Sequence, residues 1–242
     1  MIEPTYDFSG LTHLAFDADD TLWECEQYFV DAKARCTEIL ADYLPAGADL
    51  ERELYTFERR NLGIFGYGTK GFTLSLIETA VALSRGQISG ADIQRIIDLG
   101  KEMLAHPVRL LPDVAATLDR LAPRFTLLCV TKGDLFDQES KLARSGLADR
   151  FASVDIVSEK DEATYTRLFA RRGLDPARLL MVGNSLASDV LPVIAAGARA
   201  VHLPHHVTWH HEQRTPPPGV PYWTAPDLPT FADRLLAANA ET

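Results

Sequence analysis

Three carboxylates stand within four positions of the segment FDADDTLW, at Asp17, Asp19 and Asp20. A largely apolar run at 11–15 comes directly before them and is typical of a buried strand. Like charges this close repel one another, so a fold that buries them must supply a cation. Carboxylates held in that way can act as nucleophiles or transfer protons. The alternative is a solvated acidic turn without chemistry.

Polar groups also follow three later apolar runs. They are Thr131, Lys132 and Gly133 after 125–130, Lys160 after 154–157, and Asn184 with Asp189 after 179–182. Because the carboxyl ends of parallel strands lie along one edge of a sheet, we expect these groups to converge with the acidic segment. The cation that the carboxylates require is then Lys160, a metal ion, or both.

The second half of the chain alternates apolar runs with segments of helical periodicity. Strands are predicted at 11–17, 125–130, 154–157, 179–182 and 200–203, and helices at 135–145, 163–172, 187–196 and 228–238. Glycines at 146, 173 and 197 follow the first three of these helices, as expected at helix ends. The alternation predicts an α/β fold with a doubly wound, Rossmann-like parallel sheet.

A helical block separates the first strand from the others. Helices are predicted at 24–44, 50–61, 72–83 and 91–104, with turns at Pro45–Gly47 and Ser84–Gly86. We therefore predict two domains: an α/β core of residues 1–22 and 108–242, and an inserted α-helical cap of residues 23–107.

The ordered segments FDADDTLW, VTKG, Lys160 and GNSLASD resemble the four motifs of the haloacid dehalogenase (HAD) superfamily. The resemblance covers roughly residues 11–22 and 108–205, and the helical insertion after the first motif is similar to the cap of many members. It implies a HAD-type core with a helical cap. It also implies a hydrolase that forms a covalent intermediate on its first aspartate.

The resemblance assigns roles to the acidic residues. Asp17 would be the nucleophile and Asp19 the general acid, then the general base for water. Asp20 is interpreted as a turn or capping residue, and Thr21 as a local hydrogen-bond donor that supports the loop.

Magnesium is also implied, because this cation prefers oxygen ligands and would offset the repulsion between carboxylate and phosphate. The expected ligands are the Asp17 side chain, the Asp19 backbone carbonyl and the fourth motif. The chain departs from the commonest fourth motif by carrying Asn184 at its first acidic position. Asn184 would offer a neutral oxygen, and Asp189 would supply the charge directly or through a water.

Four further residues are expected around the phosphoryl group. Thr131, Lys132 and Gly133 would bind a phosphate oxygen near the start of a helix, although threonine there is also a common helix cap. Lys160 would neutralise the phosphoryl and nucleophile charges. Its alternative is a surface lysine in the charged run SEKDE.

The cap contains an unusual glycine- and aromatic-rich stretch at 63–72, which we interpret as a loop. Tyr67 and Lys70 would contact the substrate from this loop, since binding residues favour loops. The alternative is an inter-helix connection whose aromatic residues only pack within the cap. The histidines at 202, 205, 206, 210 and 211 suggest a transition-metal site, but a polar loop is favoured because no cysteine accompanies them.

Composition restricts the partners. The net charge is −10 and no block of Lys or Arg stands out, which argues against nucleic acid and anionic membranes. Three cysteines without a pairing pattern argue against a disulfide framework and favour a cytoplasmic protein. The oligomeric state is not readable from the sequence.

The favoured hypothesis is a magnesium-dependent phosphatase acting on a small phosphorylated metabolite. A 2-haloacid dehalogenase needs the aspartate nucleophile but neither the metal nor an Asp19-type acid. A phosphomutase, a phosphonate hydrolase and a non-catalytic binding protein are further alternatives, because the cap decides the substrate and fold alone does not settle function.

Overall fold

A parallel sheet organises the α/β part of the protein, as a computed structural model shows. The structure describes residues 6–44, 47–207 and 209–239. Within these residues the sheet has the strand order β3-β2-β1-β4-β5-β6, and every adjacent pair is parallel. The strands are β1 (His13–Phe16), β2 (Thr126–Lys132), β3 (Ser153–Val157), β4 (Leu179–Gly183), β5 (Arg199–His202) and β6 (Trp223–Thr224). The predicted doubly wound α/β fold is therefore confirmed.

By its internal contacts the chain divides into two compact units. One consists of residues 1–24, 108–132 and 142–242, and the other of residues 25–107 and 133–141. The first contains the sheet, and the second contains the helical block together with residues 133–141. The domain limits predicted from the sequence stay a prediction.

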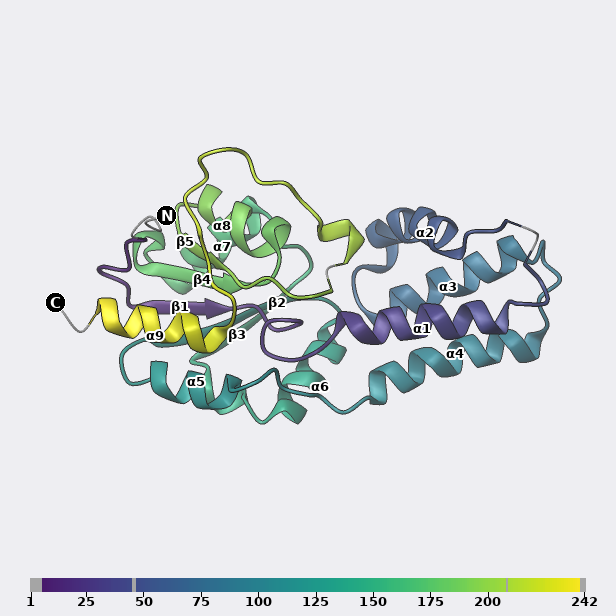
Figure 1. Ribbon diagram of the computed structural model, residues 1–242, viewed down its shortest axis with the longest axis horizontal. Helices are drawn as coiled ribbons and strands as arrows, with labels where there is room; N and C mark the ends of the chain where they lie inside the picture. Colours follow the sequence, from purple (N-terminus) through teal and green to yellow (C-terminus); the bar gives the residue numbers. More distant parts are fainter. Residues whose placement is uncertain (1–5, 45–46, 208, 240–242) are drawn as a thin grey trace. The chain divides into compact units, whose positions relative to one another are not determined.

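Helices cover both faces of the sheet within the first unit (Figure 1). They are α5 (Val114–Leu121), α7 (Glu162–Arg172), α8 (Leu191–Ala195) and α9 (Leu228–Ala238), with short 3₁₀ turns η1 (Ala148–Arg150), η2 (Pro176–Arg178) and η4 (His210–Glu212) and a π-helical turn η3 (Leu186–Val190). Helix α6 (Leu135–Ser145) is divided, since its residues up to 141 belong to the second unit and the rest to the first. The sequence did not predict α5 or β6. The helix predicted at 187–196 is in fact the π-helical turn followed by α8.

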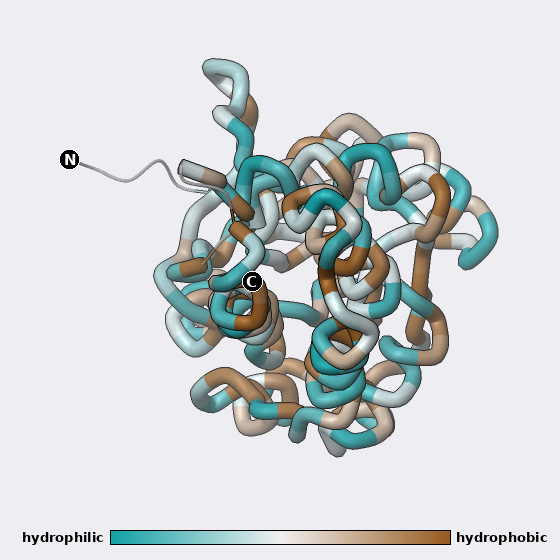
Figure 2. The backbone as a smooth tube through the Cα atoms, turned by 90° about the vertical axis from the view of Figure 1, so that its right-hand side faces the viewer, coloured by the Kyte–Doolittle hydropathy of each residue, from teal (hydrophilic) through white to brown (hydrophobic). Residues whose placement is uncertain are grey.

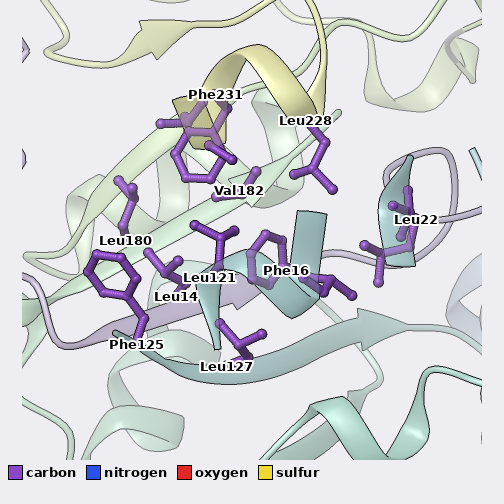
Figure 3. Packing of buried hydrophobic residues seen from close by; sticks show 14 of the residues in the cluster. Leu14, Phe16, Leu22, Leu121, Phe125, Leu127, Leu180, Val182, Leu228 and Phe231 are labelled. Carbon is purple, nitrogen blue, oxygen red and sulfur yellow. The ribbon is translucent and has the colours of Figure 1, made fainter. Parts of the chain in front are cut away.

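Alternating side chains of the central strands enter two separate cores. Leu14 and Phe16 of β1 belong to a core that includes Leu121 of α5 and Phe231 of α9, whereas Ala15 belongs to the core under α7 and α8. Figure 3 shows the first of these cores, with α9 side chains packed over those of β1 and β4. A strand buried on both faces holds its ends rigidly, so the loop after β1 starts from a fixed point.

Besides the start of α6, the described part of the second unit contains the helices α1 (Glu26–Ile39), α2 (Leu50–Phe65), α3 (Thr69–Leu83) and α4 (Gly90–Ala105). Their apolar faces meet in a core that includes Cys36, Leu54, Leu76 and Ile96. Figure 2 shows hydrophobic and hydrophilic stretches alternating along the chain, as expected for elements with one buried face. Helix α1 is shorter than predicted, and Pro45 and Ala46 of the predicted turn lie outside the described residues.

The loop predicted at 63–72 is wrong in its extent. Helix α2 continues to Phe65 and α3 begins at Thr69, which leaves only Gly66–Gly68 between them. Gly66 and Gly68 have φ angles of 72° and 104°. These left-handed conformations favour glycine and end one helix before the next begins. The other residues of the stretch continue the helices on either side.

No helix among the described residues is both long enough and apolar enough to cross a membrane.

Candidate active site

Asp17 is the first residue after β1, and its carboxylate is buried. Its backbone N–H donates to the carbonyl of Val182 at 3.0 Å, which extends the pairing with β4 by one residue. The Thr21 hydroxyl donates to Asp17 Oδ2 at 3.0 Å. Lys160 Nζ donates to Asp17 Oδ1 at 2.5 Å. Both oxygens of the predicted nucleophile are thus held by named donors, and the predicted local role of Thr21 is confirmed.

Lys160 joins two carboxylates from different strand ends. Its ammonium lies 2.5 Å from Asp17 Oδ1 and 2.7 Å from Asp189 Oδ1, and the lysine side chain is only 1% exposed. The interpretation of Lys160 as a surface lysine is therefore wrong, since a buried ammonium requires the partners that it has here. Its neighbour Asp161 instead caps α7 by accepting from Thr164 N–H.

The three charged groups set each other's ionisation. Burial, together with the nearby Asp189 carboxylate, raises the pKa of Asp17 to about 7, although the Lys160 ammonium acts in the opposite direction. Burial lowers the pKa of Lys160, but the carboxylates of Asp17 and Asp189 outweigh it and raise this pKa well above its usual value. The lysine therefore stays charged beside a carboxylate that gains a proton near neutral pH.

The π-helical turn η3 directs Asp189 back over the end of β4. Asp189 Oδ2 accepts from the Ser185 N–H at 3.0 Å, while its other oxygen meets Lys160. A Cβ added at Gly183 would lie 2.4 Å from Asp189 Cγ, so only glycine leaves room for this carboxylate. π-helical turns are rare and frequent at functional sites. Both oxygens of Asp189 are engaged with the chain, and its predicted role as a metal ligand stays a prediction.

Asn184 lies close to the predicted nucleophile, because the Thr21 hydroxyl contacts both residues. Thr21 Oγ1 is 3.3 Å from Asn184 Oδ1 and 3.0 Å from Asp17 Oδ2, and it accepts from the Asn184 N–H at 3.1 Å. His202, on β5, contacts the backbone carbonyl of Asn184 through Nε2 at 3.0 Å. The structure therefore brings the first and fourth predicted motifs together and anchors Asn184 from two sides.

The donor atoms beside Thr21 fit a hard divalent cation. Asp17 contributes a carboxylate oxygen and Asn184 an amide oxygen, and such oxygens are the ligands that Mg²⁺ prefers, with water completing the coordination. Among the described residues, no group of three or more His, Cys, Asp or Glu side chains is arranged to hold a metal ion. The oxygens of Asp17 and Asn184 thus carry less negative charge than a metal site built from several carboxylates.

The loop after β1 turns sharply at Asp20. This residue has a φ of 58°, and its N–H donates to the Trp23 carbonyl at 2.7 Å. Aspartate tolerates the left-handed conformation better than most residues, so its predicted role in a turn is confirmed. The Trp23 indole N–H donates to Asp19 Oδ1 at 2.7 Å. Asp19 is therefore fixed by a buried tryptophan of its own loop.

The end of β2 carries Thr131, which is buried, and Lys132, whose side chain is 14% exposed. Lys132 Nζ lies 2.5 Å from Glu212 Oε1 and donates to the Ser188 hydroxyl at 2.8 Å. Gly133 follows, just before α6. The predicted contacts of these residues with phosphate stay predictions, and the ammonium of Lys132 is engaged with partners that the sequence did not indicate.

Tyr67 and Lys70 belong to the helical unit. Lys70 Nζ pairs with Asp134 Oδ1 at 2.8 Å and lies 5.4 Å from the centre of the Phe136 ring. Their predicted contact with substrate stays a prediction.

The histidines of the tail do not gather around one point. His202 contacts Asn184, while His205 lies 3.7 Å from Asp20 and 4.2 Å from His206 between ring centres. The ring of His211 is tilted against that of Trp209, with their centres 4.5 Å apart.

Sequence reasoning did not indicate the supporting roles of Trp23, Ser188, His202 and Glu212; it considered His202 only as a member of a candidate metal cluster. No spacing rule links Glu212 to Lys132, which is 80 positions earlier, because the contact depends on how the segment after β5 folds back. Trp23 is the exception: its place four residues after Asp19 was visible, and an indole N–H needs an acceptor when it is buried.

Comparisons with known proteins agree with this geometry. Residues 11–197 match a family described as haloacid dehalogenase-like hydrolase. No curated protein matches the chain. Among solved structures, a haloacid dehalogenase-like family hydrolase from Xanthomonas campestris is 40% identical, with a TM-score of 0.83 and coverage of 96% of this chain and 93% of that one.

Two more distant structures share the fold. A 2-haloacid dehalogenase from Pseudomonas syringae pv. Tomato is 23% identical, with a TM-score of 0.62 and coverage of 94% of this chain and 99% of that one. A candidate HAD-hydrolase from Bacillus subtilis, solved with magnesium bound, is 19% identical, with a TM-score of 0.61 and coverage of 93% and 98%.

Proposed function

Because the chain belongs to the haloacid dehalogenase-like hydrolase family, we propose that it is a magnesium-dependent phosphatase of small phosphorylated metabolites. One observation carries the proposal: the buried Asp17–Lys160 pair is accompanied by a second carboxylate, Asp19, that is held in place by Trp23. A nucleophile alone would suit several reactions of this fold. A nucleophile with a positioned acid–base group suits the cleavage of a phosphate ester.

The first step is attack of an Asp17 oxygen on the phosphorus atom. The bond between phosphorus and the ester oxygen breaks as the bond to Asp17 forms, and Asp19 gives its proton to the departing oxygen. In the second step water attacks phosphorus and transfers a proton to Asp19. The bond to Asp17 then breaks, and inorganic phosphate leaves with both carboxylates restored to their starting state.

Lys160 has two tasks in this scheme. Its ammonium favours the ionised form of Asp17, which is the form that can attack, and it stabilises negative charge on the transferring group. Asp189 keeps that ammonium in place from the opposite side. The Thr131 hydroxyl and the backbone N–H groups before α6 would bind the remaining phosphate oxygens, as the start of a helix favours anions.

Asp17 and Asn184 would hold the magnesium ion, with the backbone carbonyl of Asp19 as the third protein ligand. When bound, the ion would supply a positive charge that offsets the repulsion between Asp17 and the phosphate. The magnesium-bound Bacillus subtilis structure shares the fold, which supports this cofactor.

A dehalogenase is the second candidate, because a 2-haloacid dehalogenase also shares the fold. That reaction would use Asp17 to displace halide from carbon and would leave Asp19 without a task. The anchoring of Asp19 by a buried indole therefore favours phosphate ester cleavage.

The deciding assay measures phosphate released from a small aryl phosphate, with magnesium or with chelator, by the parent protein and by Asp17→Asn. The proposal requires release that depends on both magnesium and Asp17. Halide release from a 2-haloacid, with no phosphate release, would establish the second candidate instead.

A further inference from the structure

A second, largely buried ionic cluster lies next to the one formed by Asp17, Lys160 and Asp189. It consists of Lys132, Ser188 and Glu212. Lys132 Nζ is 2.5 Å from Glu212 Oε1 and donates to Ser188 Oγ at 2.8 Å, and the Ser188 hydroxyl donates to the same Glu212 oxygen at 3.0 Å. The three groups thus form a closed triangle.

The cluster is well shielded from water. The side chains of Lys132 and Glu212 are 14% and 15% exposed. Burial alone would raise the pKa of Glu212, but Lys132 and the hydroxyl groups around it outweigh burial and lower this pKa instead. Glu212 is therefore a carboxylate at neutral pH, and the link to Lys132 is a full ion pair in a low-dielectric environment.

Two members of the cluster, and one residue near it, are chain neighbours of proposed catalytic or substrate-binding residues. Lys132 follows Thr131, and Ser188 precedes Asp189. Glu159, which lies 3.9 Å from Lys132 through Oε1, precedes Lys160 and accepts from its backbone N–H at 2.9 Å. Together with Glu159, the cluster therefore connects the ends of β2, β3 and β4 at the positions that carry the proposed chemistry.

Ser188 is also the most connected residue of the π-helical turn. Its N–H donates to Ser185 Oγ at 3.1 Å, and its carbonyl accepts from the buried Tyr165 hydroxyl at 3.0 Å. A displacement of Ser188 would move Asp189 directly, and Asp189 holds the Lys160 ammonium. A displacement of catalytic groups by about 1 Å can lower the rate of such a site roughly 100-fold.

We propose that Glu212 is a positioning residue of the hydrolytic site: its ion pair with Lys132 and its bond with Ser188 fix the turn that carries Asp189, and thereby keep Lys160 directed at Asp17. The inference rests on the proposed function, in which Lys160 and Asp17 are catalytic. Glu212 lies in η4, beyond the residues 11–197 that match the family. In this role Lys132 acts through Ser188 and Glu212 rather than as a ligand of phosphate.

The test compares Lys132→Met, Glu212→Gln and the double variant with the parent. Each single variant leaves one buried charge without its partner and lowers the unfolding midpoint, whereas the double variant removes both charges and restores it. If the unfolding midpoint of the double variant returns to that of the parent, any loss of activity in this variant is not caused by loss of folding. The double variant should still lose roughly 10- to 100-fold in kcat for the aryl phosphate, with KM within about twofold of the parent.

Hydrogen exchange supplies a readout that does not depend on the reaction. In the double variant, amides of residues 185–189 should exchange faster, while those of β1 and β4 remain as protected as in the parent. The matched control is Arg150→Met with Asp119→Asn, which removes an exposed ion pair of the same unit that contacts none of these residues. It should change neither kcat nor exchange at 185–189.

Two results would overturn the inference. A double variant with parental kcat and parental exchange at 185–189 would make the pair a structural contact only. A rise in KM at unchanged kcat would make Lys132 a ligand of the substrate. A parent that releases no phosphate would count against the proposed function alone, because the exchange of residues 185–189 would still decide whether the pair holds the turn.

Discussion

Replacing Lys160 by methionine tests the electrostatic core of the site most directly. Methionine fills much of the same volume, so the main change is the loss of one buried positive charge. Two carboxylates, Asp17 and Asp189, then lose bonds of 2.5 Å and 2.7 Å to a charged donor. Removing one partner of a buried ion pair typically costs about 3–5 kcal/mol. For a chain of this length, about 3 kcal/mol corresponds to a fall of roughly 6–12 °C in Tm.

The stability lost on replacing Lys160 should increase as the pH rises. The Lys160 ammonium lowers the pKa of Asp17, whereas burial, Asp189 and Asp19 raise it. Without the lysine the pKa of Asp17 therefore rises above its present value of about 7. A group whose folded pKa exceeds its unfolded pKa loses its stability contribution as the pH rises through the folded value. Above about pH 7 the Asp17 carboxyl of the parent is ionised and no longer lowers the free energy of unfolding as the pH rises. In the variant this free energy continues to fall until the pH reaches the new, higher pKa.

The measurement is the Tm of parent and Lys160→Met with chelator present, at pH 6 and pH 8.5. The difference in Tm should be larger at pH 8.5. Lys101→Met is the control, because the Lys101 ammonium is exposed and pairs with Asp98 three positions earlier on the same helix, where an ion pair contributes about 0.5 kcal/mol or less. Equal differences at the two pH values would show that Lys160 does not set the ionisation of Asp17.

Three further predictions concern the acidic residues and their partners. Asp19→Asn should lower kcat for an activated aryl phosphate less than for an alkyl phosphate, where loss of proton transfer costs roughly 100- to 10,000-fold; equal losses would argue against a proton-transfer role. Asn184→Asp should tighten magnesium binding, measured by calorimetry, since it adds a charged oxygen beside Asp17; an unchanged titration would mean that Asn184 is not a ligand. The Tm deficit of Glu212→Gln should narrow as the pH falls below 4.5, because the pKa of Glu212 is lowered in the folded protein and its contribution disappears as it takes up a proton; a deficit that stays constant to pH 3 would contradict the ion pair.

Much of the fold was predictable because the signals were local. Apolar runs followed by glycine-terminated helices marked β2, β3 and β4 and the helices after them, and the boundaries of α6 and α9 were predicted to the residue. Helix α5 was missed because it has only eight residues, and β6 because it has only two. Elements this short depend on tertiary contacts more than on periodicity.

In the candidate site, too, the features that depend on local signals were predictable and those that depend on tertiary contacts were not. Asp17, Lys160 and Asp189 were predicted from their places at strand ends, and topology alone was sufficient to bring them together. The ways in which they are held were not predictable. Asp189 engages Lys160 because a π-helical turn adds a residue that no periodicity indicates. Glu212 reaches Lys132 only after an irregular segment of the chain folds back.

The two ionic clusters differ in a way that bears on catalysis. Lys132 and Glu212 carry one charge of each sign, so their pair is neutral and has no need of a further ion. Lys160 faces two carboxylates, which leaves a net charge of −1 when all three groups are ionised. Burial and this excess of negative charge together raise the pKa of Asp17, and a cation beside Asp17 and Asn184 would offset the charge. A magnesium ion held by Asp17 and Asn184 would therefore lower the pKa of Asp17 and favour the ionised form of this residue, which is the form that attacks phosphorus.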